Sequence, residues 1–520
     1  MEVEFVESEQ LLINSNNCLL SSSLEENMAA IRSLFDSCED MEYKTIEISN
    51  VEGCLIYLPE MIDLGLLNDI EGHVQAMNNH QTIRTEQDTQ NVLKKNFSPF
   101  GVKQTNRIDS IVKLLLSGTT ILLIDNEDQA YSLQTAKYTG RAIEEAVTER
   151  TVRGPREGFV EDLNTNLALI RKRIQTPQLK VNFLTLGRQT NTKVGIVYMA
   201  GIASEDIVQE IKERLSRIDI DGILESQYIE SFIKDSKYSP FPTIYNTDRT
   251  DKVCGNLLDG KIAIIMDGSP FALTAPALFV EFLHTSQDYY DHSLAATMIR
   301  WVRFLGLFVT LILPAFYVAM TTFHPDLLQT TTLLRIAGSR EGLPYPVLIE
   351  AIFMIMTFEL IREAGLRLPK TFGSPIVIIL ALVIIGQAAV QAGIVGSVLS
   401  IVVSVTALTS FILPNYAFHQ VIRMLGLPLL IMAGVFGFMG ILIGLMFGLT
   451  HIISLRSFGV PYFTPVSPAI YQGWKDVFIR APWWGMKTRI PGMNINNFHR
   501  SGDGPPLSIG SREKKEDELE

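Results

Sequence analysis

Four long apolar runs near the C-terminal end of this 520-residue chain constrain its fold most, because each approaches or exceeds the length needed to cross a bilayer. A hydrocarbon core of roughly 30 Å needs about 20 apolar residues in a helix, and several of these runs contain no Asp, Glu, Lys or Arg. Mostly polar sequence precedes them. The runs are Phe304–Phe323, Pro375–Gly393, Ile394–Leu413 and Leu425–Leu455. The sequence therefore predicts a soluble N-terminal part followed by an all-α transmembrane bundle.

The number of membrane crossings is left open by the sequence. We expect a bundle of about four to six helices over 300–456, in which Pro375–Leu413 forms a hairpin that turns near Gln387, Gln391 and Gly393. Leu425–Leu455 suffices for one strongly tilted span and is too short for two full ones. Five crossings would place the C-terminal tail, 457–520, on the opposite side from the N-terminus. Because this tail is basic before it turns acidic, the positive-inside rule favours the inside, so either 346–361 does not fully cross or the last segment is re-entrant.

The soluble part contains short apolar runs that alternate with amphipathic stretches, which predicts an α/β fold. Two of these runs occur twice: Cys54–Leu58 resembles Gly195–Met199, and Gly118–Asp125 resembles Gly260–Asp267, at offsets of 141 and 142 residues. Chance similarity between buried strands is one explanation. A tandem duplication is the other, and it predicts two similar lobes with a ligand crevice between them. The expected boundaries are a polar, partly disordered lead over 1–40, a first lobe over 41–145 and a second lobe over 146–299.

Composition and motifs argue against several functional classes. The net charge of -12, without a clustered basic face in the soluble part, argues against nucleic-acid binding. The acidic first residues are not followed by an apolar signal region, so we expect the N-terminal domain to stay cytosolic. Phosphate-loop, nucleophile-elbow, zinc-protease and dinucleotide motifs are missing, which predicts a protein that is not an enzyme and needs no cofactor. The four cysteines lack metal-ligand spacing, so neither a metal site nor a disulfide framework is expected.

Polar residues inside the membrane region are candidates for an ion pathway. Glu350 is the first, because an ionisable side chain within a bilayer costs several kcal/mol unless it faces protein or water. The others could line a narrow wet path, since they recur at helical spacing: Gln387, Gln391, Ser397, Ser400 and Ser404. The alternatives are a polar interhelical contact or interface position for Glu350, and close helix packing for the serines.

Two further motifs favour structural roles. Gly440, Gly444 and Gly448 share one helix face and predict a groove for a neighbouring helix. In the loop around Gly154-Pro155, Arg153, Arg156 and Glu157 predict an intrachain salt-bridge latch, with anion binding by the two arginines as the alternative.

Three segments carry a family resemblance that covers about residues 40–490. They are RGPREGFVEDLNTNLALIRKRI (153–174), SPFPTIYNTDRTDKVCGNLLDGKIAIIMDGSPFALTAP (239–276) and DYYDHSLAATMIRWVRFLG (288–306). The chain is similar to the A subunits of the GerA family of spore germination proteins. The polar lead and the acidic end, SREKKEDELE, lie outside the resemblance.

This resemblance implies a protein of the inner membrane of the bacterial spore, with its N-terminal domain facing the spore core. It implies a germinant-receptor subunit that acts with a transporter-like B subunit and a lipoprotein C subunit, and that couples nutrient sensing to ion release as an oligomeric channel. The pore candidates above do not come from a family motif. A non-conducting scaffold or a modulatory paralogue that organises the same partners would share these motifs, and a secondary transporter is disfavoured because inverted helix repeats are not evident.

Overall fold

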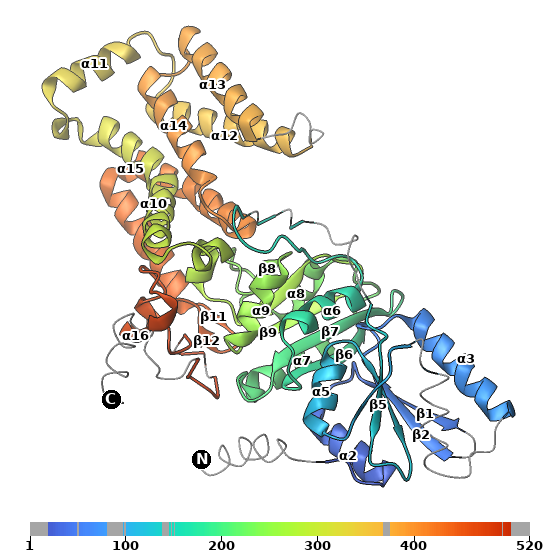
Figure 1. The fold of residues 1–520 in the computed structure, drawn as a ribbon. Helices are drawn as coiled ribbons and strands as arrows, with labels where there is room; N and C mark the ends of the chain where they lie inside the picture. Colours follow the sequence, from blue (N-terminus) through green and yellow to red (C-terminus); the bar gives the residue numbers. More distant parts are fainter. Residues whose placement is uncertain are drawn as a thin grey trace, which may run out of the picture.

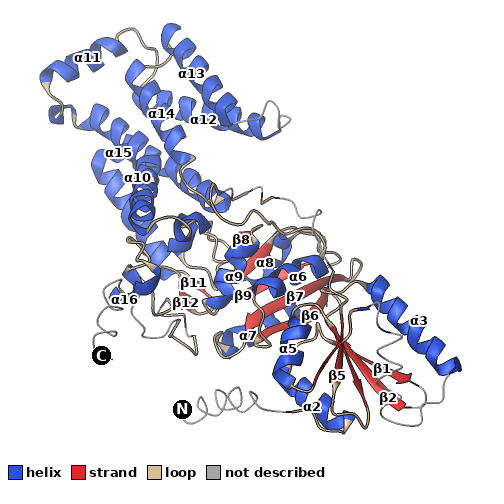
Figure 2. Cartoon of the chain, in the orientation of Figure 1, coloured by secondary structure: helices blue, strands red, loops and turns tan. Residues whose placement is uncertain are grey.

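A computed structural model describes residues 19–48, 51–80, 97, 100–137, 145, 146, 148, 149, 151–367, 375–490, 492, 493 and 495–500. Two α/β lobes stand at one end and a group of long helices extends from the second lobe at the other (Figure 1). All strands except the short β11 and β12 belong to the lobes (Figure 2). The predicted fold class, an α/β soluble part of two similar lobes followed by a helical region, is confirmed.

The first lobe is a five-stranded sheet in the order β1-β2-β4-β5-β3. Its pairings are all antiparallel, so the alternation of strands and helices does not produce the parallel sheet common in α/β proteins. Apolar strand residues are buried on both faces, which explains why β4 is a continuous apolar run. The elements are α2 (Leu24–Leu34), β1 (Glu42–Ile48), β2 (Val51–Tyr57), α3 (Leu64–His80), β3 (Lys103–Thr105), α5 (Ile108–Leu116), β4 (Thr120–Ile124) and β5 (Ala130–Leu133).

The second lobe repeats this topology, with strand order β6-β7-β9-β10-β8 and antiparallel pairing throughout. The two runs detected as repeats are equivalent central strands, β2 with β7 and β4 with β9. The elements are α6 (Leu163–Arg173), β6 (Leu179–Leu186), β7 (Thr192–Met199), α7 (Glu205–Ser216), α8 (Ser226–Ile233), β8 (Tyr245–Thr247), α9 (Thr250–Leu258), β9 (Ile262–Met266) and β10 (Ala272–Ala275).

The repeat extends to buried side chains that the sequence comparison missed. Asn27 in α2 donates from Nδ2 to the Ser21 carbonyl over 2.7 Å, and Asn166 in α6 donates likewise to the Val160 carbonyl over 2.6 Å. In each lobe the asparagine Oδ1 also accepts the N–H of the residue whose carbonyl it contacts, Ser21 in the first lobe and Val160 in the second. Each asparagine thus closes the loop that leads into the first helix of its lobe.

The expected polar lead over 1–40 is wrong for its second half. Leu24, Ile31 and Phe35 are buried in the core of the first lobe, on α2, which is the counterpart of α6. Residues 1–18 lie outside the described part of the chain. The prediction failed because Ser/Asn-rich sequence around Leu20 suggested a loose segment, whereas those side chains cap and close a helix.

The two lobes are joined by a buried ion pair instead of an open crevice. We call the segment before β1 that carries Glu39 and Asp40 the Asp40 strap. Arg171 in α6 donates to Asp40 over 2.8 and 2.9 Å, and the side chains are 1% and 0% exposed. Next to this pair, Glu39 accepts the Phe183 N–H of β6 over 2.7 Å. The segment before β1 therefore fastens the first lobe to the second.

The helical region consists of long helices connected by short turns. Two of them, α10 and α15, are long and apolar enough to cross a membrane on length and composition, and α13 and α14 include shorter apolar helices. The elements are η3 (Phe279–Leu283), η4 (Ser286–Tyr289), α10 (Ser293–Phe323), η5 (Pro325–Leu327), α11 (Thr330–Arg340), α12 (Val347–Arg367), α13 (Pro375–Gln391), α14 (Ser397–Ser410), α15 (Tyr416–Ser454), β11 (Arg456–Ser457), β12 (Val460–Pro461), α16 (Tyr471–Trp474) and η6 (Trp483–Gly485).

The last apolar segment is not one tilted helix. At Gly437, φ is 62° and ψ is -141°, and the chain reverses there so that Gly440 packs against the Met432 backbone and Gly444 against Leu429. The first arm of this hairpin begins at Tyr416, well before the predicted Leu425. At 1.5 Å per residue the two arms of α15 are roughly 31 and 25 Å long, close to the thickness of a bilayer core.

The helix ends fall at two levels. Phe323, at the end of α10, meets Gly437 at the tip of the α15 hairpin. At the opposite level, Thr310 donates to Thr409 over 3.1 Å near the end of α14. In the described part of the chain, six helical segments form the passes between these levels: α10, α12, α13, α14 and the two arms of α15.

The segment predicted as a tail is part of the folded core as far as the structure describes it. Phe458 and Val460 are buried with the strands of the second lobe, as are Met493 and Ile495. The acidic end beyond residue 500 lies outside the described residues. An even number of passes therefore returns the chain to the lobes from which α10 departs.

Candidate functional site

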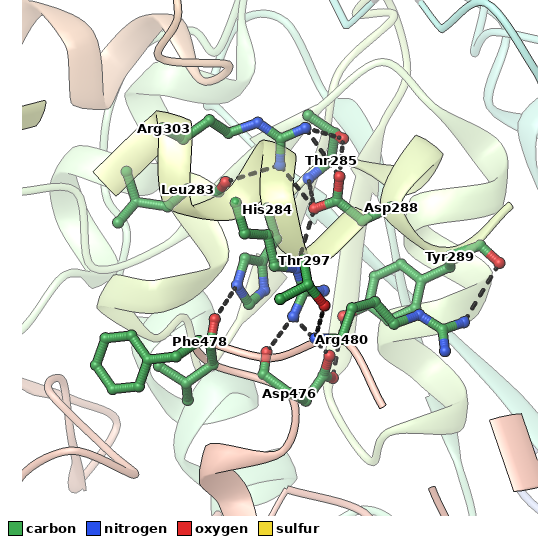
Figure 3. Close-up of polar contacts among 12 residues, drawn as sticks. Leu283, His284, Thr285, Asp288, Tyr289, Thr297, Arg303, Asp476, Phe478 and Arg480 are labelled. Carbon is green, nitrogen blue, oxygen red and sulfur yellow. Dashed lines mark hydrogen bonds and ion pairs between the residues drawn. The ribbon is translucent and has the colours of Figure 1, made fainter. Parts of the chain in front are cut away.

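The neck is the place where the second lobe, the helical region and the returning chain meet; it comprises η4, the first turns of α10 and residues 476–480 (Figure 3). Arg300 and Arg303, three residues apart on α10, face the same way. Both donate to Asp288: Arg303 from Nη1 and Nη2 over 2.7 and 2.8 Å, and Arg300 from Nε over 3.3 Å. The arginines thereby anchor α10 to the carboxylate of η4.

Local capping holds Asp288 in place. Its Oδ1 accepts from the Thr285 hydroxyl over 3.0 Å and its Oδ2 from the Thr285 N–H over 3.3 Å, a capping box at the start of η4. Burial alone would raise the pKa of Asp288, but hydrogen bonds and charge from Arg303, with the charge of Arg300, hold that pKa below its usual value. The carboxylate therefore stays ionised between the two guanidinium groups.

The returning chain contributes the second carboxylate. Arg300 donates from Nη1 to both the backbone carbonyl and Oδ1 of Asp476, over 2.6 and 3.0 Å, and the Tyr289 hydroxyl donates to Oδ2 over 3.1 Å. The side chain of Arg300 is 0% exposed. One buried cation therefore connects η4, α10 and the segment after α16.

Further bonds tie the returning segment to the first turns of α10. Thr297 accepts the Arg480 N–H over 3.0 Å, and Trp301 donates from Nε1 to the Phe478 carbonyl over 2.9 Å. His284 donates from Nε2 to the Val477 carbonyl over 3.2 Å, because a carbonyl can only accept. Burial and the nearby Arg300 charge lower the pKa of His284 well below its usual value, so this imidazole is neutral.

The chemistry of the neck suits mechanical coupling. Buried charges joined by several hydrogen bonds are costly to separate, so these contacts hold the second lobe, α10 and the returning chain together. The carboxylates are each held by arginines, and among the described residues no hydrogen-bonded pair of nucleophile and base converges with them. Across the described part of the chain no group of three metal-ligating side chains was found.

Glu350 lies in a polar contact between helices. It is 1% exposed, accepts from Arg340 of α11 over 2.9 Å, and accepts the Gly396 N–H at the start of α14 over 3.1 Å. The carboxylate thus satisfies a helix N-terminus and an arginine at the level far from the lobes. The structure brings it close to the start of α14, where Ser397 lies, and its two oxygens already have partners.

The remaining pore candidates do not form a closed path within one chain. Gln387, Gln391 and Ser397 are exposed on the surface of α13 and α14. Ser400 is partly buried and its Oγ lies 2.9 Å from where a Cβ at Gly386 would stand, so it packs between the two helices. Ser404 is also partly buried. Gln387 and Gln391 belong to α13, so the hairpin turn lies after them, at Ala392–Gly396.

The prediction that the glycine face forms a groove for a separate neighbouring helix is wrong. Gly440 and Gly444 pack against the other arm of the same α15 hairpin, at Met432 and Leu429, instead of against a separate helix. Among the described residues, no atom lies within 4 Å of the position that a Cβ on Gly448 would occupy, so Gly448 is not part of this contact. The small residues therefore allow the chain to reverse closely on itself.

In the predicted latch loop, Arg156 pairs with Glu145 over 3.0 Å, both side chains being 70% exposed. Glu157 accepts from Arg173 over 2.6 Å. Arg153 is exposed. These are intrachain ion pairs, and the exposed one contributes little stability.

The residue that secures this loop is Arg249, which the sequence did not single out. It is 2% exposed and donates to the carbonyls of Glu149 and Pro155 over 2.9 and 3.0 Å, and to Asp251 over 2.7 Å. The signal was available in the sequence, since Arg107-Ile-Asp109 and Arg249-Thr-Asp251 repeat at an offset of 142 residues. The neck was missed for another reason: Arg300 and Arg303 looked like ordinary basic flanks of a membrane span.

The comparisons identify relatives over almost the full length. A family profile described as Bacillus/Clostridium GerA spore germination protein matches residues 29–491. The chain is 40% identical to Spore germination protein KA of Bacillus subtilis (strain 168), over 96% of this chain and 92% of that protein, and 39% identical to Uncharacterized membrane protein YfkQ of the same organism, over 91% of each. A crystal structure of the N-terminal domain of the A subunit of the Bacillus megaterium spore germinant receptor GerK3 is 32% identical, with a TM-score of 0.40, and covers 50% of this chain and 98% of that one.

Proposed function

The chain belongs to the GerA family of spore germination proteins, and we propose that it is a receptor A subunit that couples nutrient sensing to ion release. Relatives such as Spore germination protein KA are named as spore germination proteins, and A subunits of this family are components of germinant receptors. On this proposal it acts with a transporter-like B subunit and a lipoprotein C subunit and performs no covalent chemistry.

The observation that carries the proposal is the buried neck. A chain that only needed a membrane anchor could connect its soluble part to α10 by a simple linker. Here Asp288 and Asp476 fix α10 to η4 and to the returning segment through Arg300 and Arg303. A displacement of the second lobe would therefore reach the helices directly.

For the membrane arrangement we propose six passes, with the lobes and the returning segment on the spore-core side of the inner membrane. The apolar length of α10 and of the two α15 arms supports crossing, and the paired helix ends support alternating passes. The packing of Val460 and Ile495 onto the second lobe requires the same side for both. This also satisfies the positive-inside preference of the basic residues after α15.

For conduction we propose that several copies surround a shared path. One chain offers no closed polar path among its described residues, while Gln387, Gln391 and Ser397 are exposed polar residues on helices that otherwise expose apolar side chains. A neighbouring copy would complete the path and remove these groups from lipid.

The test is potassium release from spores that carry Ser397→Lys, measured with a fast potassium electrode at quantified protein level. A cation added to a conducting path should repel cations and slow release at least severalfold. Thr450→Lys is the matched control, because it adds the same charge to an exposed hydroxyl residue on α15. Slower release in Ser397→Lys alone supports conduction, and normal release in both variants contradicts it.

The alternative is a non-conducting scaffold or modulatory paralogue. A scaffold predicts that Ser397→Lys leaves the rate of potassium release unchanged in assembled receptors, whereas Asp288→Asn lowers the amount of co-purified partner subunits.

A further inference from the structure

A cavity of about 160 Å³ lies beside the neck, between the second lobe and the returning chain. One face of α9 forms a wall of it, with Lys252, Asn256 and Asp259 pointing the same way at helical spacing. Other walls come from η3, η4 and the segment after α16. The cavity thus lies where three parts of the molecule meet, and its contents would contact all of them.

The carboxylates that line this cavity already have partners. Asp251 accepts from Arg249 over 2.7 Å and from the Tyr290 hydroxyl over 2.6 Å, and Asp476 accepts from Arg300 over 3.0 Å. The other two are engaged as well: Asp259 pairs with Arg500, and Glu281 with Lys261. The acidic lining is therefore neutralised within the chain.

Two polar groups of the lining remain available. The ammonium of Lys252 lies 5.0 Å from the centre of the Tyr245 ring, and no carboxylate oxygen of the described residues lies within 4 Å of it. The carboxylate whose charge acts on it most strongly, Glu149, accepts from the Tyr245 hydroxyl through Oε1 over 2.6 Å, and its Oε2 has no hydrogen-bond partner in the described structure. Ser286 is 5% exposed, and its Oγ has no hydrogen-bond partner in the described structure.

A buried hydroxyl without a partner is costly, and so is an unpaired ammonium in a low-dielectric site. Burial lowers the pKa of Lys252, and the charges of Glu149 and Glu281 oppose this shift without reversing it. An anion in the cavity would remove both costs, because it accepts from the ammonium and from the hydroxyl.

The walls and the volume define the rest of the ligand. Leu278, Val280, Val477 and Ile490 are apolar side chains of the lining, and the ring of Trp483 adds to them. A cavity of about 150 Å³ accommodates benzene, so this one takes a molecule of about six non-hydrogen atoms. The single unpaired cation among the described lining residues matches one negative charge.

We propose that this cavity binds a small monocarboxylate with a short apolar body, its carboxylate held by Lys252 and Ser286. Binding would join α9, η4 and the returning chain across the neck and stabilise their present arrangement. The site is separate from ion conduction, because its occupancy can be measured on the purified chain without any flux.

The experiment is isothermal titration of the purified full-length chain in detergent with sodium butyrate, which fits the size limit. We expect saturable binding that Lys252→Met weakens at least tenfold, while Ser286→Ala weakens it severalfold and leaves the fold intact. Lys193→Met is the matched control: Lys193 also lies over an aromatic ring, 3.8 Å from the centre of Phe183, but outside the cavity.

Three further titrations decide the chemistry of the site. Sodium octanoate should bind at least tenfold more weakly than butyrate because it exceeds the cavity, and butylammonium should not bind because it carries the wrong charge. Inorganic phosphate should bind more weakly, since it leaves the apolar walls uncovered. Absence of saturable butyrate binding, equal affinity in Lys252→Met, or tighter binding of butylammonium or phosphate would each overturn the proposal.

Discussion

The two lobes contain the same arginine and aspartate pair in very different surroundings. Arg107 and Asp109 in the first lobe have side chains that are 48% and 24% exposed, whereas Arg249 and Asp251 in the second are 2% and 4% exposed. In both, Arg Nε donates to the aspartate Oδ1, over 3.0 and 2.9 Å. Duplication of the fold therefore preserved the pair and changed what covers it.

The cover in the second lobe is the connection to the rest of the molecule. The loop carbonyls of Glu149 and Pro155 accept from Arg249, and the Tyr290 hydroxyl, just before α10, donates to Asp251. An exposed ion pair contributes about 0 to 1 kcal/mol, while one partner of a buried pair cannot be removed without leaving a buried charge. The same two residues are thus a surface pair in one lobe and a structural joint in the other.

The largest effect should follow from removing the buried carboxylate of the neck, Asp288, which pairs with Arg300 and Arg303. Asp288→Asn removes the carboxylate that neutralises Arg300 and Arg303, and we expect a loss of about 3 to 5 kcal/mol in the free energy of unfolding. Thermal unfolding of the purified full-length chain measures this. Asp109→Asn in the first lobe is the control, with an expected loss below about 1 kcal/mol. Equal losses would contradict the difference between the lobes.

The second prediction compares the two arginines directly. Arg249→Met should cost about 2 to 4 kcal/mol, because Asp251 and two loop carbonyls lose their donor in a buried site. Arg107→Met should cost less than about 1 kcal/mol. Proteolysis of the loop around Gly154 provides a second measurement, since only Arg249→Met should accelerate cleavage there. If the rate of cleavage is unchanged in Arg249→Met, Tyr290 and the neck hold the loop without the arginine.

The sequence was informative where local patterns determine structure. Apolar length identified the helical region, and similarly patterned strands such as Gly118–Asp125 and Gly260–Asp267 indicated the two similar lobes. These signals depend on residues that are close in the chain. They required no knowledge of which surfaces meet.

The sequence was uninformative where distant segments meet. The reversal at Gly437 depends on contact between the two arms of α15, and an apolar run with several glycines is equally compatible with one long helix. Likewise Asp288 and Asp476 are far apart in the chain, and an arginine that pairs with both has the same local sequence signature as a solvent-exposed membrane flank. Pairings of this kind are fixed by tertiary packing, which periodicity does not encode.

The third prediction tests where the lobes should behave alike. Asn27→Ala and Asn166→Ala each leave a partly buried loop carbonyl and N–H without their side-chain partner, and we expect losses of about 2 kcal/mol in both variants. Urea unfolding of the full-length chain, followed by fluorescence, measures them. A difference larger than about 1 kcal/mol between the variants would mean that contacts outside the lobes also stabilise one of these loops.

The smallest effect is a pH dependence located on α8 of the second lobe. Burial raises the pKa of Glu230 from 4.5 to about 7, against the opposing charge of Lys234. Because the folded state binds this proton more tightly than the unfolded state, the stabilising contribution is complete below about pH 4.5 and is lost as the pH rises through about 7.

In the second lobe, Glu230→Gln should therefore flatten the dependence of the melting temperature on pH between about 5 and 8, by the equivalent of about 1 to 2 kcal/mol once partial solvent screening is included. Glu213→Gln on the neighbouring α7 is the control, because its side chain is 54% exposed. An unchanged slope in Glu230→Gln would place the pH sensitivity elsewhere. The first candidate would then be Glu60, which lies beside Asp40 and whose own pKa is also raised by burial. The pH-sensitive group would in that case belong to the junction between the lobes and not to the second lobe.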